Sequence, residues 1–268
     1  MKPQISEFSF GYALTEALVR EGTSPVLAAP LFPSLLKEGA PGGGYDLMLT
    51  HADGLAFLQF KLSDHMVKKS ASECGKGHFS PPFFRMHIRP ASISNQHAML
   101  CEWAQKGHWV YYAAPAFHTQ AEFNDAYLQR KIVDRTFFIS PLQIGKLSTS
   151  EEHHVAFDTS HNHRVYSKKG RAVSGAFGRR WFTELRSEGL RIPRGEVRSV
   201  AERTVNELTE FLQERGRSSD ARLVRETLAR RNEDPVAQLA DLSRTLLDCE
   251  VLLVGEGTSE KKGTTQVP

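Results

Sequence analysis

Three residues near position 50 combine, in type and spacing, the groups needed for chemistry at a metal ion. Asp46 is followed, after twelve residues, by Gln59-Phe60-Lys61. The Asp46 carboxylate, the Gln59 amide oxygen and the Phe60 carbonyl are oxygen ligands of the kind that Mg²⁺ accepts alongside water. Lys61, beside such an ion, could orient an attacking water and stabilise developing negative charge. The pattern therefore predicts hydrolysis at a divalent cation.

The residues around this pattern favour a β-hairpin. A glycine turn, a strand, an Asp-Gly turn and a second strand follow one another at 42–44, 45–49, 51–54 and 55–61. In an antiparallel hairpin the start of the first strand lies beside the end of the second, which would bring Asp46 to Gln59 and Lys61. Gln59 and Lys61 are two residues apart, so both side chains leave the same face of their strand.

A glycine-rich approach to Asp46, a hairpin and a Gln-x-Lys strand end resemble the PD-(D/E)xK nuclease superfamily. The likeness is greatest to Mrr-type restriction endonucleases, in which glutamine replaces the acidic residue. It covers residues 5–62 by motif and extends by strand–helix alternation to about residue 140. Tyr45 stands where the family name has proline, and Gln59 lowers the negative charge around the metal. The resemblance implies a restriction-endonuclease-like α/β fold and a nuclease that uses Mg²⁺ or Mn²⁺ to cut DNA.

The family also carries a glutamate on the helix before the hairpin. A helix is predicted over 5–21, with Ser6 as its N-cap and apolar residues recurring every three to four positions. We favour Glu7 as a further catalytic residue and metal ligand because it precedes the apolar pattern, as the family glutamate often does. Glu16 is the alternative. The two are nine residues, or 2.5 turns, apart, so only one can face the metal.

Further elements alternate along the chain as expected for an α/β core over residues 1–167. Helices are predicted at 96–105 and 122–133, and strands at 83–88, 109–114, 136–139 and 154–157. The range 174–254 shows helical patterns and almost no strand signal, so we predict a helical extension there. The tail, 255–268, is rich in Gly, Ser, Thr and Lys and is predicted to be disordered.

Basic residues suggest where nucleic acid would bind. Lys68 and Lys69 follow the Gln-x-Lys strand, and Arg85 and Arg89 share one face of the next strand, so these four are the predicted DNA contacts. Gln96 and His97 open a predicted helix. They could line a phosphate groove, but a capped helix start with a partly buried imidazole is the preferred interpretation.

The charge of the second half is uneven. Residues 164–231 hold 17 lysines and arginines against 9 acids. Such a segment can contact phosphates, or it can be a solvated helix surface with many Arg–Glu pairs, because the acids are interleaved with the bases.

The sequence argues against membrane-spanning, secreted, disulfide-rich, zinc-ribbon and nucleotide-binding proteins and against serine hydrolases. No apolar run approaches roughly 18 residues, and the N-terminus lacks a secretory pattern, so we expect a cytoplasmic protein without a membrane span. Cys74, Cys101 and Cys249 are widely separated, which argues against a disulfide framework or a zinc ribbon. No Walker loop and no Gly-x-Ser-x-Gly elbow is present.

Three functions remain open at this point. The first is the DNA nuclease, in restriction or phage defence with a protein partner, as the resemblance implies; a homodimer would suit cutting of two strands. The second is a non-catalytic module of the same fold that binds nucleic acid or a partner. The third is an assembly subunit whose helices after residue 174 form an oligomer interface.

Overall fold

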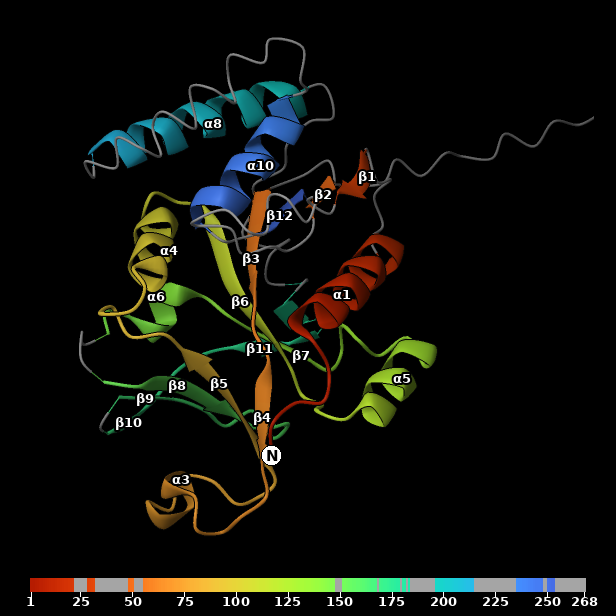
Figure 1. The fold of residues 1–268 in the computed structure, drawn as a ribbon, viewed down its shortest axis with the longest axis vertical. Helices are drawn as coiled ribbons and strands as arrows, with labels where there is room; N and C mark the ends of the chain where they lie inside the picture. Colours follow the sequence, from red (N-terminus) through yellow and green to blue (C-terminus); the bar gives the residue numbers. More distant parts are fainter. Residues whose placement is uncertain are drawn as a thin grey trace, which may run out of the picture.

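The chain forms a mixed α/β structure in which two β-sheets are flanked by helices (Figure 1). The computed structural model describes residues 1–21, 28–31, 48–50, 55–147, 151–167, 169–178, 180–181, 183, 196–214, 235–247 and 250–253. The α/β class predicted from the sequence is confirmed.

The first sheet contains seven of the described strands. In spatial order they are β1 (Ala28–Leu31), β2 (Met48–Thr50), β12 (Glu250–Leu253), β3 (Leu55–Phe60), β6 (Trp109–Pro115), β7 (Thr136–Ile139) and β11 (Ala176–Phe177). β3 and β6 run parallel, in a register that pairs Gln59 with Tyr112. Parallel neighbours need a long crossover, and this one includes helix α4 (Gln96–Gln105).

The second sheet is antiparallel throughout. Its strands, in order, are β10 (Gly170–Ala172), β9 (His163–Tyr166), β8 (His153–Phe157), β5 (Phe83–Ile88) and β4 (Ser63–Met66). Only Lys61 and Leu62 separate β3 from β4, so the chain passes from one sheet directly into the other. The sheets share a core, in which the Phe137 ring of β7 stacks on Phe157 of β8 with centroids 4.4 Å apart.

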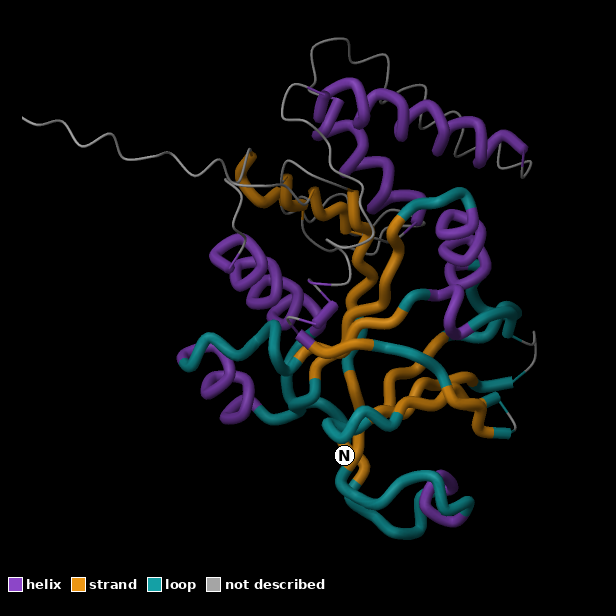
Figure 2. Tube along the Cα trace, turned by 180° about the vertical axis from the view of Figure 1, so that it is seen from behind, coloured by secondary structure: helices purple, strands orange, loops and turns teal. Residues whose placement is uncertain are grey.

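Helices cover both faces of the first sheet (Figures 1 and 2). Besides α4 they are α1 (Glu7–Glu21), α5 (Gln120–Leu128), α6 (Pro141–Ile144), α8 (Val197–Glu214) and α10 (Pro235–Leu247), and the remaining described helix is α3 (Ser72–Gly75). Buried side chains of α1 and α5 belong to one hydrophobic core, and those of α4, α6, α8 and α10 belong to another. α3 lies apart from these, in the loop between β4 and β5 (Figure 1).

Close packing of α1 against β3 depends on a glycine. Phe10 and Leu14 are fully buried with Leu58 and Phe60 in the same core. A Cβ atom on Gly11 would lie 2.5 Å from the Phe60 ring, which is closer than a side-chain carbon can approach. The glycine therefore lets the helix backbone rest directly on the strand, with the Phe10 and Phe60 rings edge to face.

Most predicted elements of the first half are confirmed. The strands at 83–88 and 136–139 and the helix at 96–105 coincide with β5, β7 and α4. The predicted first helix begins at Glu7, and the Ser6 Oγ accepts a hydrogen bond from the Ser9 amide at 3.0 Å, as expected of an N-cap.

The predicted hairpin pairing is wrong. β2 and β3 are not hydrogen-bonded neighbours, because β12 lies between them, parallel to β2 and antiparallel to β3. β2 and β3 are still antiparallel to each other, as predicted, but they are one strand apart. The turns expected at 42–44 and 51–54 lie outside the described residues.

The predicted helix at 122–133 is shifted. α5 begins at Gln120, because Thr119 and Glu122 form a capping box, and it ends at Leu128. Arg130 has a positive φ of 57°, a conformation that terminates a helix.

The expectation of almost no strand in 174–254 is also wrong. α8 and α10 confirm the helices, but β11 and β12 are strands, and β12 lies inside the first sheet. A short apolar run such as Val251-Leu252-Leu253 fits a helix or a strand equally well by periodicity. The tail at 255–268 lies outside the described residues. In the described part of the chain, no helix has the length and apolar character needed to cross a membrane.

Candidate functional site

Gln59 and Lys61 lie where β3 leaves the first sheet. The Lys61 amide donates to the Ala113 carbonyl at 2.9 Å, which continues the β3–β6 ladder one residue past the strand. Alternation along this extended segment predicts that Lys61 lies on the same face as Gln59, and this shared face stays a prediction. Gln59 is 1% exposed, whereas Lys61 is half-buried. The pair thus joins a buried amide to a partly accessible ammonium.

The Gln59 amide is held by hydrogen bonds on both sides. Its Oε1 accepts from Nε2 of Gln96, the first residue of α4, and its Nε2 donates to the Phe60 carbonyl at 3.2 Å. These bonds fix the orientation of a group that would otherwise rotate. Each carbonyl oxygen has two lone pairs, so both oxygens keep capacity for a further partner.

His97, the next residue of α4, has a structural role. Its Nδ1 lies 3.0 Å from the Tyr112 hydroxyl and its Nε2 2.8 Å from the Gly145 carbonyl. Burial lowers the pKa of this imidazole, so the neutral ring accepts from Tyr112 and donates to Gly145. The burial of His97 at the helix start is confirmed, but the N-cap residue Asn95 makes no side-chain capping bond, and the Gln96 amide donates to Ser94 Oγ at 3.3 Å.

Asp46 lies outside the described residues, and β2 begins two residues after it. Leu252 of β12 pairs with Leu49 on one side and Ala56 on the other. The first residues of β2 and the last residues of β3 therefore lie at the same end of the sheet, with β12 between the two strands. Neighbouring strands are about 4.8 Å apart, so the β2 and β3 backbones are separated by roughly 10 Å. Contact between Asp46 and Gln59 stays a prediction.

The structure does not bring Glu7 to Gln59. Glu7 begins α1, which packs on the face of β3 formed by Leu58 and Phe60, and Gln59 points to the opposite face. Whether the Glu7 carboxylate joins the ligand set stays a prediction. Glu16 is on the same helix, and both its carboxylate oxygens accept from Arg20, at 2.7 and 2.8 Å.

The oxygen atoms described at the end of β3 are of the kind that binds a hard cation, but they carry no negative charge. Gln59 and Phe60 offer uncharged oxygens, which Mg²⁺ and Mn²⁺ accept. No cluster of three or more His, Cys, Asp or Glu side chains suited to a metal ion occurs within the described ranges. Asp46, the carboxylate predicted for such a site, lies outside the described residues.

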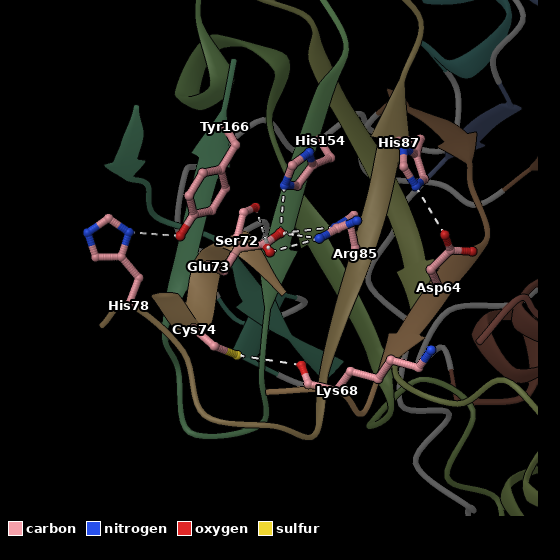
Figure 3. A network of polar contacts seen from close by, with 10 residues as sticks. All are labelled: Asp64, Lys68, Ser72, Glu73, Cys74, His78, Arg85, His87, His154 and Tyr166. Atoms are coloured by element: carbon pink, nitrogen blue, oxygen red, sulfur yellow. Dashed lines mark hydrogen bonds and ion pairs between the residues drawn. The ribbon is translucent and has the colours of Figure 1, made fainter. Parts of the chain in front are cut away.

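Arg85 forms an ion pair with Glu73, and its predicted contact with DNA stays a prediction. Its guanidinium binds Glu73 of α3 in bidentate fashion, with Nη2 2.7 Å from each carboxylate oxygen and Nε 3.0 Å from Oε1 (Figure 3). Glu73 is fully buried, and the Arg85 side chain is 19% exposed. His154 Nε2 lies 2.8 Å from the same Oε1.

Electrostatics explain the protonation of this network. Burial acts to raise the pKa of Glu73, but a backbone hydrogen bond and the Arg85 guanidinium outweigh it, and the pKa lies below its ordinary value. Burial and the positive charge of Arg85 lower the pKa of His154 to about 4. At neutral pH, His154 is therefore uncharged and donates Nε2–H to a carboxylate that Arg85 neutralises.

A second acid, Asp64, lies on the neighbouring strand. Its carboxylate is 3.0 Å from the Lys2 ammonium and 3.1 Å from His87 Nε2. Burial acts to raise the pKa of Asp64, yet the bonds from Lys2 and His87 hold it below its ordinary value. Both acids that the structure describes on this face of the second sheet are thus paired with basic groups.

The remaining predicted DNA contacts are exposed. Lys68 and Lys69 follow β4 in the loop that carries α3. Arg89 follows β5 and lines a pocket of about 400 Å³ together with Lys146. β5 pairs with β4, so it lies beside the chain that continues from Lys61 and not beside β3 itself.

The sequence did not identify Glu73 or Asp64 as members of polar networks. It suggested Gln96 as a residue of a phosphate groove, but a simple helix start was the preferred interpretation. Glu73 had one available signal, since it is the single acid in a lysine-bearing segment between two strands. Comparison of the chain with family models, curated proteins and solved structures finds no match.

Proposed function

We propose that this chain is a metal-dependent nuclease of restriction-endonuclease-like fold that hydrolyses phosphodiester bonds in DNA. The observation that carries the proposal is the burial of the Gln59 amide and its hydrogen bond to Gln96. A hairpin with an ordinary polar end would leave Gln59 in water. A fully buried amide oxygen held in a fixed orientation is instead what a ligand position requires.

The arrangement of elements agrees with this proposal. Strand β3, which contains Gln59 and ends one residue before Lys61, pairs in parallel with β6 after a crossover that includes β4, β5 and α4, and α1 covers the opposite face. The wide separation of the cysteines fits action in the cytoplasm. A role in restriction or phage defence, with a protein partner or as a homodimer, belongs to the same proposal.

In this mechanism, Asp46, Gln59 and the Phe60 carbonyl would hold Mg²⁺ or Mn²⁺. The bound ion would polarise the scissile phosphate and lower the pKa of a water molecule. The Lys61 ammonium would position that water and stabilise the charge that develops on the phosphate. Gln96 would keep the Gln59 oxygen aimed at the ion. Glu7 begins α1, which covers the other face of β3, and it is given no ligand role in this mechanism.

A cleavage assay tests the proposal. Supercoiled plasmid is incubated with Mg²⁺ or Mn²⁺ and with wild type, Asp46→Ala, Lys61→Ala or Lys131→Ala, the last changing an exposed lysine after α5. We expect nicked or linear products from wild type and Lys131→Ala, and a loss of roughly a hundredfold or more in the other two. Equal activity in all four proteins, or none in wild type on duplex, single-stranded and branched DNA and on RNA, would contradict the proposal.

A non-catalytic nucleic-acid-binding module of the same fold is the second candidate. The observation that favours it is the exposure of Lys68, Lys69 and Lys76 on the loop between β4 and β5, since exposed lysines can contact phosphates without catalysis. Its signature is salt-sensitive DNA binding that survives Asp46→Ala, together with intact plasmid in the cleavage assay.

A further inference from the structure

The loop between β4 and β5, residues 67–82, buries its acid and exposes its bases. Its charged residues are Lys68, Lys69, Glu73 and Lys76. All three lysines are exposed, whereas Glu73 is fully buried. Carboxylates are rarely buried completely, and this one is neutralised underneath by Arg85. The outward side of the loop therefore carries positive charge without the usual compensating acid.

A second basic turn lies against this loop. The turn between β9 and β10 carries exposed Lys169 and then Gly170. A Cβ atom on Gly170 would lie 2.5 Å from the Tyr166 ring and 2.8 Å from His78, so the loop and the turn are in direct contact. The Lys76 ammonium sits 5.3 Å from the centre of the same Tyr166 ring.

The loop is also held in one conformation. The His78 ring bonds the Tyr166 hydroxyl at 3.0 Å, and the His78 carbonyl accepts from the Asn162 side chain at 2.6 Å. Glu73 ties the centre of the loop to the sheet through Arg85 (Figure 3). Positive groups held in place in this way lose less conformational entropy when they bind an anion.

Asp158, an acid of the β8–β9 turn, is engaged locally, whereas exposed Glu152 precedes β8 beside the β9–β10 turn. Asp158 Oδ1 accepts from the amides of Ser160 and Asn162, at 2.8 and 3.1 Å. Asp158 keeps its negative charge, but its carboxylate binds the backbone amides of the β8–β9 turn. The described groups that face outward on the loop and the β9–β10 turn are therefore mainly lysines.

We propose that Lys68, Lys69, Lys76 and Lys169 form a docking surface for the phosphate backbone of duplex DNA, with Glu73 as the positioning residue. Lysines contact phosphates without regard to sequence, and a row of them is the usual electrostatic footprint of a DNA surface. This inference rests on the proposed nuclease function, because β4 leads from Lys61 straight to the loop.

The spacing between the two sites suits one duplex. Lys68 is seven positions after Lys61, which spans at most about 23 Å of extended chain. That length corresponds to about seven base pairs at 3.4 Å each. A duplex cut beside Lys61 would thus be held on the loop about two-thirds of a turn away.

Binding measured without cleavage tests the surface. A fluorescent duplex of 30 base pairs is titrated in EDTA with Asp46→Ala protein and with the same protein carrying Lys68→Gln, Lys69→Gln and Lys76→Gln, at several salt concentrations. Each phosphate contact contributes about 0.9 to the slope of log K against log salt. We expect the triple change to reduce that slope by about 2 to 3 and to weaken binding roughly tenfold or more at 0.1 M salt.

A matched triple change supplies the control. Lys106→Gln, Lys131→Gln and Arg198→Gln remove three exposed charges from the α4–β6 turn, the segment after α5, and α8. This control should keep the slope of the parent protein. An unchanged slope in the loop variant, equal losses in both variants, or no binding by the parent would overturn the docking surface. None of these results depends on cleavage, so the nuclease proposal is decided separately by the plasmid assay.

Discussion

Replacing Glu73 by glutamine should destabilise the protein strongly, because it leaves the Arg85 charge under the loop without its counter-ion. The carboxylate is fully buried and takes three short bonds from Arg85, at 2.7, 2.7 and 3.0 Å. Removing one partner of a buried ion pair costs about 3–5 kcal/mol. Arg85 keeps 19% exposure and can turn partly toward water, so we expect a loss near the lower end, about 3 kcal/mol.

A surface pair of the same chemistry provides the comparison. Glu16 and Arg20 also form a bidentate pair, at 2.7 and 2.8 Å, but their side chains are 31% and 29% exposed. Exposed pairs contribute about 0–1 kcal/mol. Glu16→Gln should therefore lower the free energy of unfolding by less than about 1 kcal/mol.

Urea unfolding followed by tryptophan fluorescence measures both changes. A further variant, Glu73→Leu with Arg85→Met, removes both charges and should recover most of the loss, since no unpaired charge then remains. Hydrogen exchange of residues 67–82 should accelerate in Glu73→Gln and stay near wild type in Glu16→Gln. Equal losses in the two single variants, or a double change costlier than Glu73→Gln, would refute the argument from burial.

Three further predictions follow from the packing and the protonation states. Gln96→Leu removes the donor to Gln59, and the loss of about 1–1.5 kcal/mol in positioning should lower plasmid cleavage about tenfold with little change in DNA binding in EDTA. His163 is buried, with a folded pKa of about 4 against an ordinary 6.5. The unfolded state therefore binds more protons between these values, so stability decreases as the pH is lowered through that window. His163→Phe should remove about 2 kcal/mol of the difference in urea stability between pH 7 and pH 5. Gly11→Ala should cost about 1–3 kcal/mol, because the new methyl group meets the Phe60 ring, and Phe60→Leu should reduce that cost in a double-mutant cycle.

Local patterns were sufficient to predict most elements of the first half. The helix at 96–105 and the strands at 83–88 and 136–139 coincide with α4, β5 and β7. Each is a segment whose apolar spacing matches one period and whose ends carry polar or turn residues. The proximity of Gln59 and Lys61 was equally predictable, because it depends only on alternation along one extended segment.

Pairing between distant segments was not predictable in the same way. β12 lies between β2 and β3, although about 200 residues separate it from them. Hairpin signals describe the turn and its flanking strands, but they do not exclude insertion of a third strand from far along the chain. The short apolar run at 250–253 fits helix and strand patterns alike, and only the place available in the sheet decides between them.

The sequence by itself therefore determined the α/β class, most elements of the first half and the shared face of Gln59 and Lys61. Tertiary structure alone decided that Glu7 and Gln59 lie on opposite faces of β3, that Gln96 holds the Gln59 amide, and that Glu73 neutralises Arg85. These relations depend on which surfaces are buried against one another. Burial is a property of the packed chain, because it depends on contacts between segments that are far apart in the sequence. Local sequence patterns do not indicate which of these segments will be in contact.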